Sequence, residues 1–174
     1  MSGGVMDPNE HLVEQYVRIV KKCFTMTNIK FGNNREIDIL AIDASGKAYQ
    51  IEIDIHKGGL QWGPCGSDGY TPEQYKQKKF NKKTKDFIRE EFGLRKTEDI
   101  WVCWGIHPKR RESALKKAKK ANIKIWECGD ILKELLDKIE QTRYYDDITQ
   151  SLSLVKAANL LKYPSNETFL EHEK

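Results

Sequence analysis

Residues 36–55 read EIDILAIDASGKAYQIEIDI, and this stretch decides the fold. It contains two apolar runs, 36–43 and 48–55, which have the length and the β-branched composition of strands. The residues between them, DASGK at 43–47, have the composition and length of a hairpin loop. The stretch therefore predicts two neighbouring antiparallel strands.

Acidic side chains interrupt both predicted strands. Because side chains alternate along a strand, Glu52 and Asp54 share one face with Gln50 and His56, while Asp38 lies on the partner strand. Burying like charges together costs free energy unless a cation neutralises them. Carboxylate oxygens suit Mg²⁺ or Mn²⁺. A metal held on a strand pair in turn favours hydrolysis of phosphate esters.

Helical and strand-like patterns alternate along the rest of the chain. Apolar residues at helical spacing predict a first helix over 10–24, capped by Asn9, and a short strand follows at 29–31. Beyond a glycine-rich loop at 57–71, the predicted elements are a helix over 72–92, a strand over 99–106, a helix over 108–121, a strand over 123–127, a helix from 129 and a last helix over 148–161.

This order predicts an α/β fold with a mixed five-stranded central sheet flanked by helices. The first three strands predict an antiparallel meander. The last two alternate with helices and predict a parallel pair. A length of 174 residues fits one domain, which we place at 9–145, followed by a C-terminal helix and tail at 146–174.

Positive charge is concentrated in two regions. The net charge is only +4, but residues 76–85 include six lysines and no acid, and basic residues gather again at 109–111 and 116–120. Such faces attract nucleic acid, although a solvated helix surface explains either run alone. We expect DNA as the partner, with RNA as an alternative, and contacts from Lys76, Lys79, Lys82, Lys83, Arg110 and Arg111.

The cysteines and the lack of long apolar runs bear on the compartment. Four scattered cysteines form no C-x-x-C pair, which argues against a zinc finger, and Cys103 and Cys128 fall in apolar runs that predict buried thiols in strands. No secretory leader and no run of membrane-spanning length is present. We therefore expect a cytoplasmic protein that does not enter the membrane.

In these residues the chain resembles the PD-(D/E)XK, or restriction-endonuclease-like, nuclease superfamily. It looks most like the small archaeal and bacterial resolvase-like and Mrr-type members, over about residues 10–136. Asp38 matches the first motif position and Glu52 the second, while Ile37 stands where the name proline would be and Asp54 where the motif has lysine. The resemblance implies an αβββαβ core with extra C-terminal αβα elements.

The resemblance also implies a chemistry, that of a metal-dependent endonuclease. Asp38, Glu52 and the Ile53 backbone carbonyl would hold Mg²⁺ or Mn²⁺. Glu14 resembles the family's additional acid on the first helix, and Glu10 is the second choice.

Position 54 is the main departure from the family pattern, because an aspartate cannot supply the positive charge of the motif lysine. Asp54 could be a general base, a ligand of a second ion, or an acid paired with a lysine; His56 could transfer protons or face solvent. The missing cation could come from the helix at 72–92. The candidates there are Lys76, Lys79 and Lys83, and the alternative is that all three contact only water or the DNA backbone.

The aromatic residues divide into two groups. Trp62 and Tyr70 lie within the glycine-rich loop, where they could stack on an unpaired base or pack as part of a lid. Trp101, Trp104 and Trp126 lie in predicted strands and are expected in the core.

Three functions remain compatible with the sequence. The first is a nuclease that hydrolyses DNA phosphodiester bonds, and a homodimer would suit symmetrical cleavage by such an enzyme. The second is a catalytically degenerate nuclease fold that binds nucleic acid or partner proteins without cleavage. The third is a protein-interaction or scaffold unit.

Overall fold

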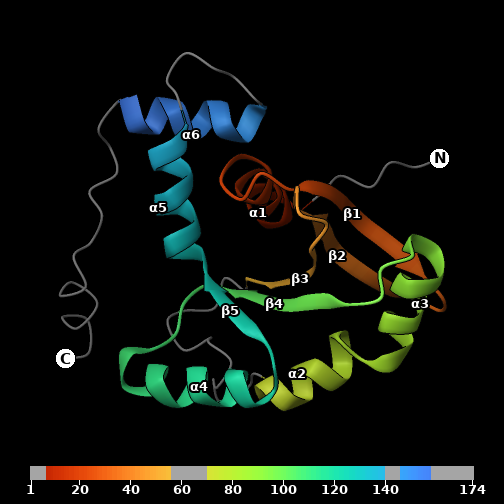
Figure 1. Ribbon diagram of the computed structural model, residues 1–174. Coiled ribbons are helices and arrows are strands. Elements are labelled where there is room, and N and C mark those ends of the chain that lie inside the picture. Colours follow the sequence, from red (N-terminus) through yellow and green to blue (C-terminus); the bar gives the residue numbers. More distant parts are fainter. Residues whose placement is uncertain (1–6, 56–69, 140–145, 158–174) are drawn as a thin grey trace. The chain divides into compact units, whose positions relative to one another are not determined.

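The computed structural model describes residues 7–55, 70–139 and 146–157. Figure 1 shows the elements, which are α1 (Pro8–Ile19), β1 (Phe24–Phe31), β2 (Arg35–Ile42), β3 (Ala48–Asp54), α2 (Pro72–Lys79), α3 (Lys82–Phe92), β4 (Thr97–Cys103), α4 (Pro108–Lys120), β5 (Lys124–Glu127), α5 (Cys128–Lys138) and α6 (Asp147–Ala157). The chain divides into two compact units, Met1–Leu135 and Leu136–Lys174. Their boundary lies within α5.

The five strands form one mixed sheet in the order β1-β2-β3-β4-β5. The pairs β1–β2 and β2–β3 are antiparallel, whereas β3–β4 and β4–β5 are parallel. This arrangement confirms the α/β class, the meander of the first three strands and the parallel pairing of the last two. Tight turns join the antiparallel strands, and the parallel strands need the helical crossovers that the chain supplies.

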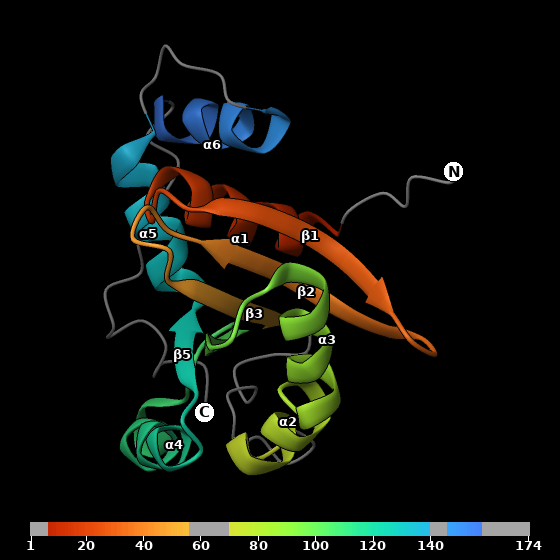
Figure 2. The same ribbon diagram turned by 45° about the vertical axis from the view of Figure 1, so that its right-hand side comes forward.

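Helices cover both faces of the sheet, as two tryptophans show. Trp126 on β5 meets the edge of the Tyr16 ring of α1 at a centroid distance of 5.4 Å. Trp101 on β4 points to the opposite face and stacks on Tyr75 of α2 at 3.8 Å. Helices α2, α3 and α4 lie on the Trp101 face and α1 on the other, as Figures 1 and 2 show.

The first helix is shorter than the predicted 10–24 and the first strand is longer than 29–31. The side chain of Asp7, not that of Asn9, accepts the capping hydrogen bond, with Pro8 in the first turn. The helix ends because Lys22 adopts a positive φ of 54°. The β-prone residues from Phe24 to Phe31 then pair with β2, so Phe24 belongs to the strand.

The predicted helix over 72–92 is two helices. Phe80 leaves the helical conformation, and Asn81 has extended backbone and caps α3 by accepting a hydrogen bond from the Thr84 N–H. Asparagine is among the best N-cap residues, because its short side chain replaces a missing helical acceptor. The buried Phe80 side chain keeps the joint against the sheet.

The fourth strand ends at Cys103, earlier than the predicted 106. Trp101 and Cys103 are buried as expected, but Trp104 lies beyond the strand with 48 % of its surface exposed, so its core assignment was wrong. Cys128 is buried, but it opens α5 and does not lie in a strand. Strand alternation cannot be extended past the last paired residue.

The second unit contains the end of α5 and the helix α6. The Asp146 carboxylate accepts a hydrogen bond from the Thr149 N–H at 2.8 Å and so caps α6. Within the same unit the Lys156 ammonium donates to the backbone carbonyls of Leu136 and Ile139. Among all the described helices, none combines the length and the apolar character that crossing a membrane requires.

Candidate active site

Asp38 lies where β2 separates from both of its neighbours. The β2–β3 register ends at the Ile39–Ile51 pair, and the β1–β2 register skips the position between Thr27 and Ile29, opposite Asp38. The residue skipped on β1 is Asn28, which has a positive φ of 52°.

This separation makes the Asp38 side chain available. Its Oδ2 accepts a hydrogen bond of 2.6 Å from the Ile53 N–H. If the β2–β3 ladder continued, this N–H would donate to a backbone carbonyl of β2 instead. The side chain is nevertheless largely buried. Asp38 is therefore fixed on β3 next to Glu52.

Glu52 is the most enclosed acid of the site, with no exposed surface. Its Oε1 accepts a hydrogen bond of 2.8 Å from the side-chain amide of Gln50, two residues earlier on the same strand face. The same amide donates to the Lys79 backbone carbonyl at 3.2 Å, and so connects β3 to the end of α2. Gln50 thus orients both Glu52 and the backbone that carries Lys79.

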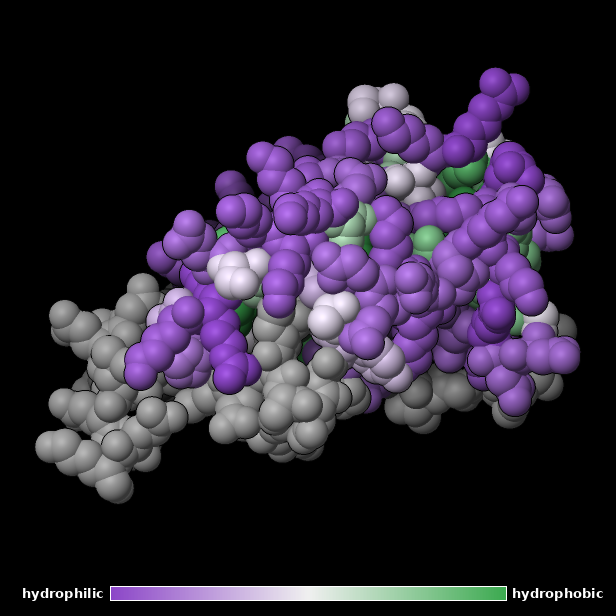
Figure 3. All heavy atoms as spheres, turned by 90° about the horizontal axis from the view of Figure 1, so that it is seen from below, coloured by the Kyte–Doolittle hydropathy of each residue, from purple (hydrophilic) through white to green (hydrophobic). Residues whose placement is uncertain are grey.

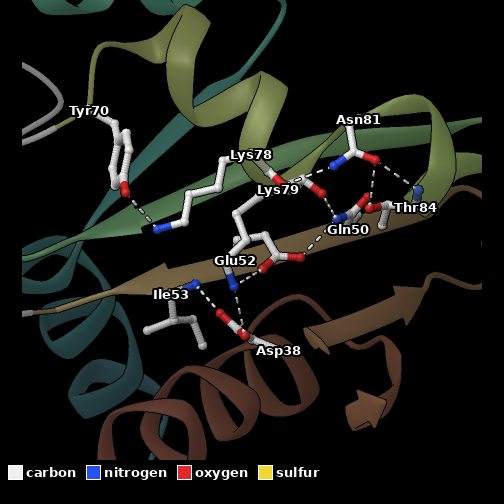
Figure 4. A network of polar contacts seen from close by, with 9 residues as sticks. All are labelled: Asp38, Gln50, Glu52, Ile53, Tyr70, Lys78, Lys79, Asn81 and Thr84. Carbon is white, nitrogen blue, oxygen red and sulfur yellow. Dashed lines mark hydrogen bonds and ion pairs between the residues drawn. The ribbon is translucent and has the colours of Figure 1, made fainter. Parts of the chain in front are cut away.

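The Lys79 ammonium lies between the two acids, as Figure 4 shows. Its Nζ is 2.8 Å from Glu52 Oε2 and 3.5 Å from Asp38 Oδ1. The approach to Glu52 is an ion pair without hydrogen-bond geometry, because Oε2 is buried and accepts no hydrogen bond from the described residues. Two acids and one lysine, from three separate elements, therefore converge on one point.

The pKa values follow from burial and from the shared charge. Burial, assisted by the negative charge of Asp38, raises the pKa of Glu52 to about 7, although Lys79 and Gln50 act in the opposite direction. Burial also raises the pKa of Asp38, against the attraction of Lys79. Burial alone would lower the pKa of Lys79, but the charges of Glu52 and Asp38 outweigh it and the pKa rises. Lys79 therefore stays positively charged near neutral pH.

Of the two candidate acids on α1, Glu10 is electrostatically coupled to Asp38. Burial, followed by the negative charge of Asp38, raises the pKa of Glu10 to about 6, and the Asn28 side chain donates a hydrogen bond to it. Glu14 instead accepts a hydrogen bond of 2.9 Å from the Thr25 hydroxyl. The charge of Asp38 thus influences Glu10, and the choice between Glu10 and Glu14 as the additional acid stays a prediction.

The Asp38–Glu52 pair is where the sequence predicts a divalent cation. No three His, Cys, Asp or Glu side chains in the described part of the chain are grouped closely enough to hold a metal ion. Mg²⁺, however, commonly takes only one or two carboxylates and completes its shell with water and phosphate oxygens. The buried Glu52 Oε2 faces the Lys79 ammonium at 2.8 Å, so an ion bound there would share this carboxylate with the lysine.

For the other residues predicted to belong to the centre, the structure gives a position but no direct contact with both acids, or does not describe them. Asp54 ends β3 opposite Cys103 of β4, on the same strand face as Glu52. The Ile53 peptide is held beside Asp38 through its N–H, and the ligand role of its carbonyl stays a prediction. His56, Trp62 and most of the glycine-rich loop lie outside the described residues. Tyr70 is described, and its hydroxyl accepts a hydrogen bond of 2.9 Å from Lys78.

The lysines and arginines expected to bind DNA differ in their exposure to solvent and in the groups that they contact. Lys79 belongs to the acidic centre, the Lys76 ammonium donates to the Ala121 carbonyl at 2.5 Å, and Arg111 pairs with Glu127. Lys82, Lys83 and Arg110 have exposed side chains. Figure 3 shows the face seen from below in Figure 1, whose described part is largely hydrophilic.

Two residues near the centre escaped the sequence argument. Lys85 of α3 reaches Gln50, Thr97 and Asp99 on the sheet, and Tyr75 of α2 packs on Trp101 on the same face. The alternation of β3 placed Gln50 beside Glu52, and the candidates Lys76, Lys79 and Lys83 included the lysine that reaches the acids but not Lys85. Only the break at Asn81 decides which lysine of each helix faces the sheet.

Comparisons with known proteins identify no family for this chain. Neither a family model nor a curated protein matches the sequence. Among solved structures, that of SfsA from Pyrococcus furiosus in complex with Ca²⁺ is similar, with a TM-score of 0.35 and 12 % identity, over 67 % of this chain and 52 % of that one. The chain thus spans about half of that protein, and a similarity of this degree carries no inference about function.

Proposed function

We propose that this protein is a metal-dependent nuclease that hydrolyses DNA phosphodiester bonds. The single observation that carries the proposal is the position of Lys79 Nζ against both Glu52 and Asp38. The resemblance to the PD-(D/E)XK superfamily requires two acids and a lysine, and the sequence lacks the lysine at position 54. A lysine from α2, Lys79, contacts both acids and would take the role of the missing motif lysine.

Each residue of the centre has a role in this proposal. Mg²⁺ or Mn²⁺, held by Asp38, Glu52 and the Ile53 carbonyl, would act as a Lewis acid on the scissile phosphate and lower the pKa of the attacking water. Lys79 would place its positive charge against a phosphate oxygen, where charge develops during hydrolysis. Asp54 would accept a proton as general base, and His56 would assist that transfer. Glu10, or else Glu14, would contact the centre through a water molecule.

The exposed basic residues would position the DNA. Lys82, Lys83 and Arg110 contribute exposed positive charge, and Arg111 adds to it from its pair with Glu127. Phosphate contacts of this kind orient the duplex without reading its sequence, and they weaken steeply with salt. Lys76 would join them only by leaving the Ala121 carbonyl.

The compartment and the oligomeric state belong to the same proposal. The three described cysteines are free thiols, as expected of a protein in the reducing cytoplasm. A homodimer would allow both strands of a symmetrical substrate to be cut. Sedimentation of the protein with and without DNA would test the dimer directly.

Isosteric replacement of the two acids tests the function. Asp38→Asn and Glu52→Gln should each lower cleavage by at least about 1,000-fold and abolish Mn²⁺ binding in calorimetry, because each removes a charged ligand at nearly constant volume. Glu36→Gln is the matched control, since Glu36 is exposed on the same strand as Asp38. A wild-type protein that is inert on duplex, single-stranded and branched DNA with both metals would refute the proposal.

One observation favours a second candidate function. The Lys79 ammonium already compensates part of the acidic charge without a metal ion, which would suit a degenerate nuclease fold that binds nucleic acid or partner proteins without cleavage. This alternative predicts salt-dependent DNA binding that persists in EDTA and in Glu52→Gln, with no turnover.

A further inference from the structure

Tyr75 is held rigidly in the middle of α2 on the face of the sheet that carries Glu52. It is 2 % exposed. Its ring stacks on Trp101 with a centroid distance of 3.8 Å and an interplanar angle of 7°, and meets Phe80 edge-on at 5.9 Å. Trp101 is the register partner of Glu52 on the neighbouring strand. The packing therefore fixes the ring next to the acidic centre.

The Tyr75 hydroxyl is buried, yet it has no hydrogen-bond partner among the described residues. Leaving a hydroxyl buried and unsatisfied costs about 1–3 kcal/mol, which a phenylalanine would avoid. Trp101 Nε1, on the ring that stacks against Tyr75, shares this condition. Buried polar atoms are almost always satisfied in folded proteins, so two such donors on one face indicate that a polar ligand completes the site.

The surroundings of the hydroxyl indicate what kind of ligand it awaits. Burial raises the pKa of Tyr75 well above its ordinary value, and the negative charges of Glu52, Asp54 and Asp38 raise it further. The hydroxyl therefore lies within the field of the acidic centre and keeps its proton, so it acts as a hydrogen-bond donor and not as a base. None of the described carboxylates accepts that bond. A donor in this position would bind an anionic oxygen that arrives with the substrate.

We propose that Tyr75 is a catalytic residue whose hydroxyl donates a hydrogen bond to a non-bridging oxygen of the phosphodiester bound between Asp38, Glu52 and Lys79. This inference rests on the proposed nuclease function and adds a substrate contact from α2. The proton stays on the tyrosine throughout, and no bond to it forms or breaks. The donor stabilises the negative charge that grows on the phosphate oxygens during hydrolysis.

The variant Tyr75→Phe separates this role from a structural one. It keeps the stacked ring and removes only the unsatisfied hydroxyl, so the urea midpoint should be unchanged or higher. Cleavage should fall by about 100-fold, mainly in kcat, as expected for the loss of one donor to a developing oxyanion. The matched control is Tyr49→Phe, because the Tyr49 hydroxyl donates to Asp43 at 2.8 Å on the other face of the sheet. That variant should lower the urea midpoint and leave cleavage within twofold of wild type.

A binding measurement makes the test independent of cleavage. Inorganic phosphate, titrated calorimetrically into the Mn²⁺-loaded protein, should bind about tenfold more weakly to Tyr75→Phe, while the affinity for Mn²⁺ itself is unchanged. Equal phosphate affinity in the variant and the wild type would overturn the inference, as would a lowered urea midpoint, which would reveal a structural partner for the hydroxyl. A wild type that binds phosphate through Tyr75 but cleaves no DNA would refute the nuclease function and leave the hydroxyl contact standing.

Discussion

Two lysines on successive helices meet the same face of the sheet in different ways. Lys85 of α3 donates to Gln50 Oε1 at 2.8 Å and Thr97 Oγ1 at 2.6 Å, and pairs with the buried Asp99. Lys79 of α2 is surrounded by Glu52 and Asp38. Both are buried lysine–carboxylate pairs on the α2–α3 side of the sheet.

The two pairs differ in whether the lysine and the acids around it balance each other in charge and in hydrogen bonds. Around Lys85, one acid and two neutral acceptors match the three N–H donors of one ammonium, so the pair is satisfied. Around Lys79, two acids share one ammonium, and Glu52 Oε2 accepts no hydrogen bond from the described residues. A satisfied buried pair holds elements together, whereas the two acids around Lys79 carry more negative charge than one ammonium balances when both are ionised.

The pKa directions of the two lysines agree with this division. Burial lowers the pKa of Lys85 in spite of Asp99, whereas the two acids around Lys79 raise its pKa in spite of burial. Gln50 connects the two centres, because it accepts from Lys85 and donates to Glu52. The Lys85 pair therefore holds Gln50 in place beside Glu52.

The largest expected effect is a loss of DNA cleavage on substitution of Lys79, and it distinguishes this lysine from Lys85. Lys79→Met should lower DNA cleavage by about 100- to 1,000-fold in a plasmid assay with Mg²⁺, because it removes the charge next to the phosphate. Lys78→Met, at the neighbouring position on the same helix, should leave cleavage within about threefold, since Lys78 contacts the exposed Tyr70 hydroxyl. Activity retained to within tenfold in Lys79→Met would show that the two lysines are both structural.

The second largest effect is a loss of stability on substitution of Lys85, which distinguishes this lysine from Lys79. Lys85→Met leaves the buried Asp99 without its cation and should lower the free energy of unfolding by about 3 kcal/mol. Its activity should fall less than that of Lys79→Met, by about tenfold through the loss of Gln50 orientation. Urea unfolding of Lys85→Met beside Lys83→Met, an exposed lysine of the same helix, measures the difference. Equal midpoints in the two variants would contradict the structural role of Lys85.

The pH dependence of stability should come mainly from Glu52. Its pKa is about 7 in the folded protein against 4.5 ordinarily. Between these values the folded state holds a proton that the unfolded chain has released, so stability is highest at low pH and falls as the pH rises towards 7. In EDTA, the free energy of unfolding should decrease by on the order of 2 kcal/mol from pH 5 to pH 7.5 through this group.

Glu52→Gln tests this assignment, because the amide cannot titrate in that range and should flatten the curve. Asp99→Asn should flatten it less, since burial also raises the pKa of Asp99 but the charge of Lys85 and its hydrogen bond oppose that rise. If wild type and Glu52→Gln gave parallel curves, Glu52 would have an ordinary pKa and the proposed excess of charge would be absent.

The smallest effect concerns the joint between the two helices. Asn81 caps α3 and donates to the Lys78 carbonyl at 2.9 Å, so it sets the direction of α2 relative to α3. Asn81→Ala should lower the free energy of unfolding by about 1 kcal/mol and cleavage by a few-fold. Asn81→Asp, which keeps the capping acceptor, should recover most of the stability but not the bond to Lys78. Lys85→Met should lose more activity than Asn81→Ala if Gln50 is the main support of Lys79. The reverse order would show that the joint at Asn81 contributes more than Gln50 to the position of Lys79.

The sequence analysis succeeded where a short repeat controls the structure. The period of two in residues 36–55 predicted the β2–β3 pair and the common location of Asp38 and Glu52. It failed at the first helix, where apolar spacing continued to Phe24 although the backbone turned at Lys22. It also failed at residues 72–92, where an apolar stripe runs across a joint that a single Asn81 cap creates. A periodic pattern reports which face of an element is buried, but not where the element stops.

By itself, the sequence determined the α/β class, the meander of the first three strands and the pair of acids, because each depends on neighbours along one strand or one helix. Tertiary structure alone decided that Lys79 and not Lys76 or Lys83 joins those acids, and that Trp104 lies outside the core. These choices depend on where a helix bends and where two strands separate. Such points are set by the packing of distant residues, since one cap or one left-handed residue redirects every side chain that follows it.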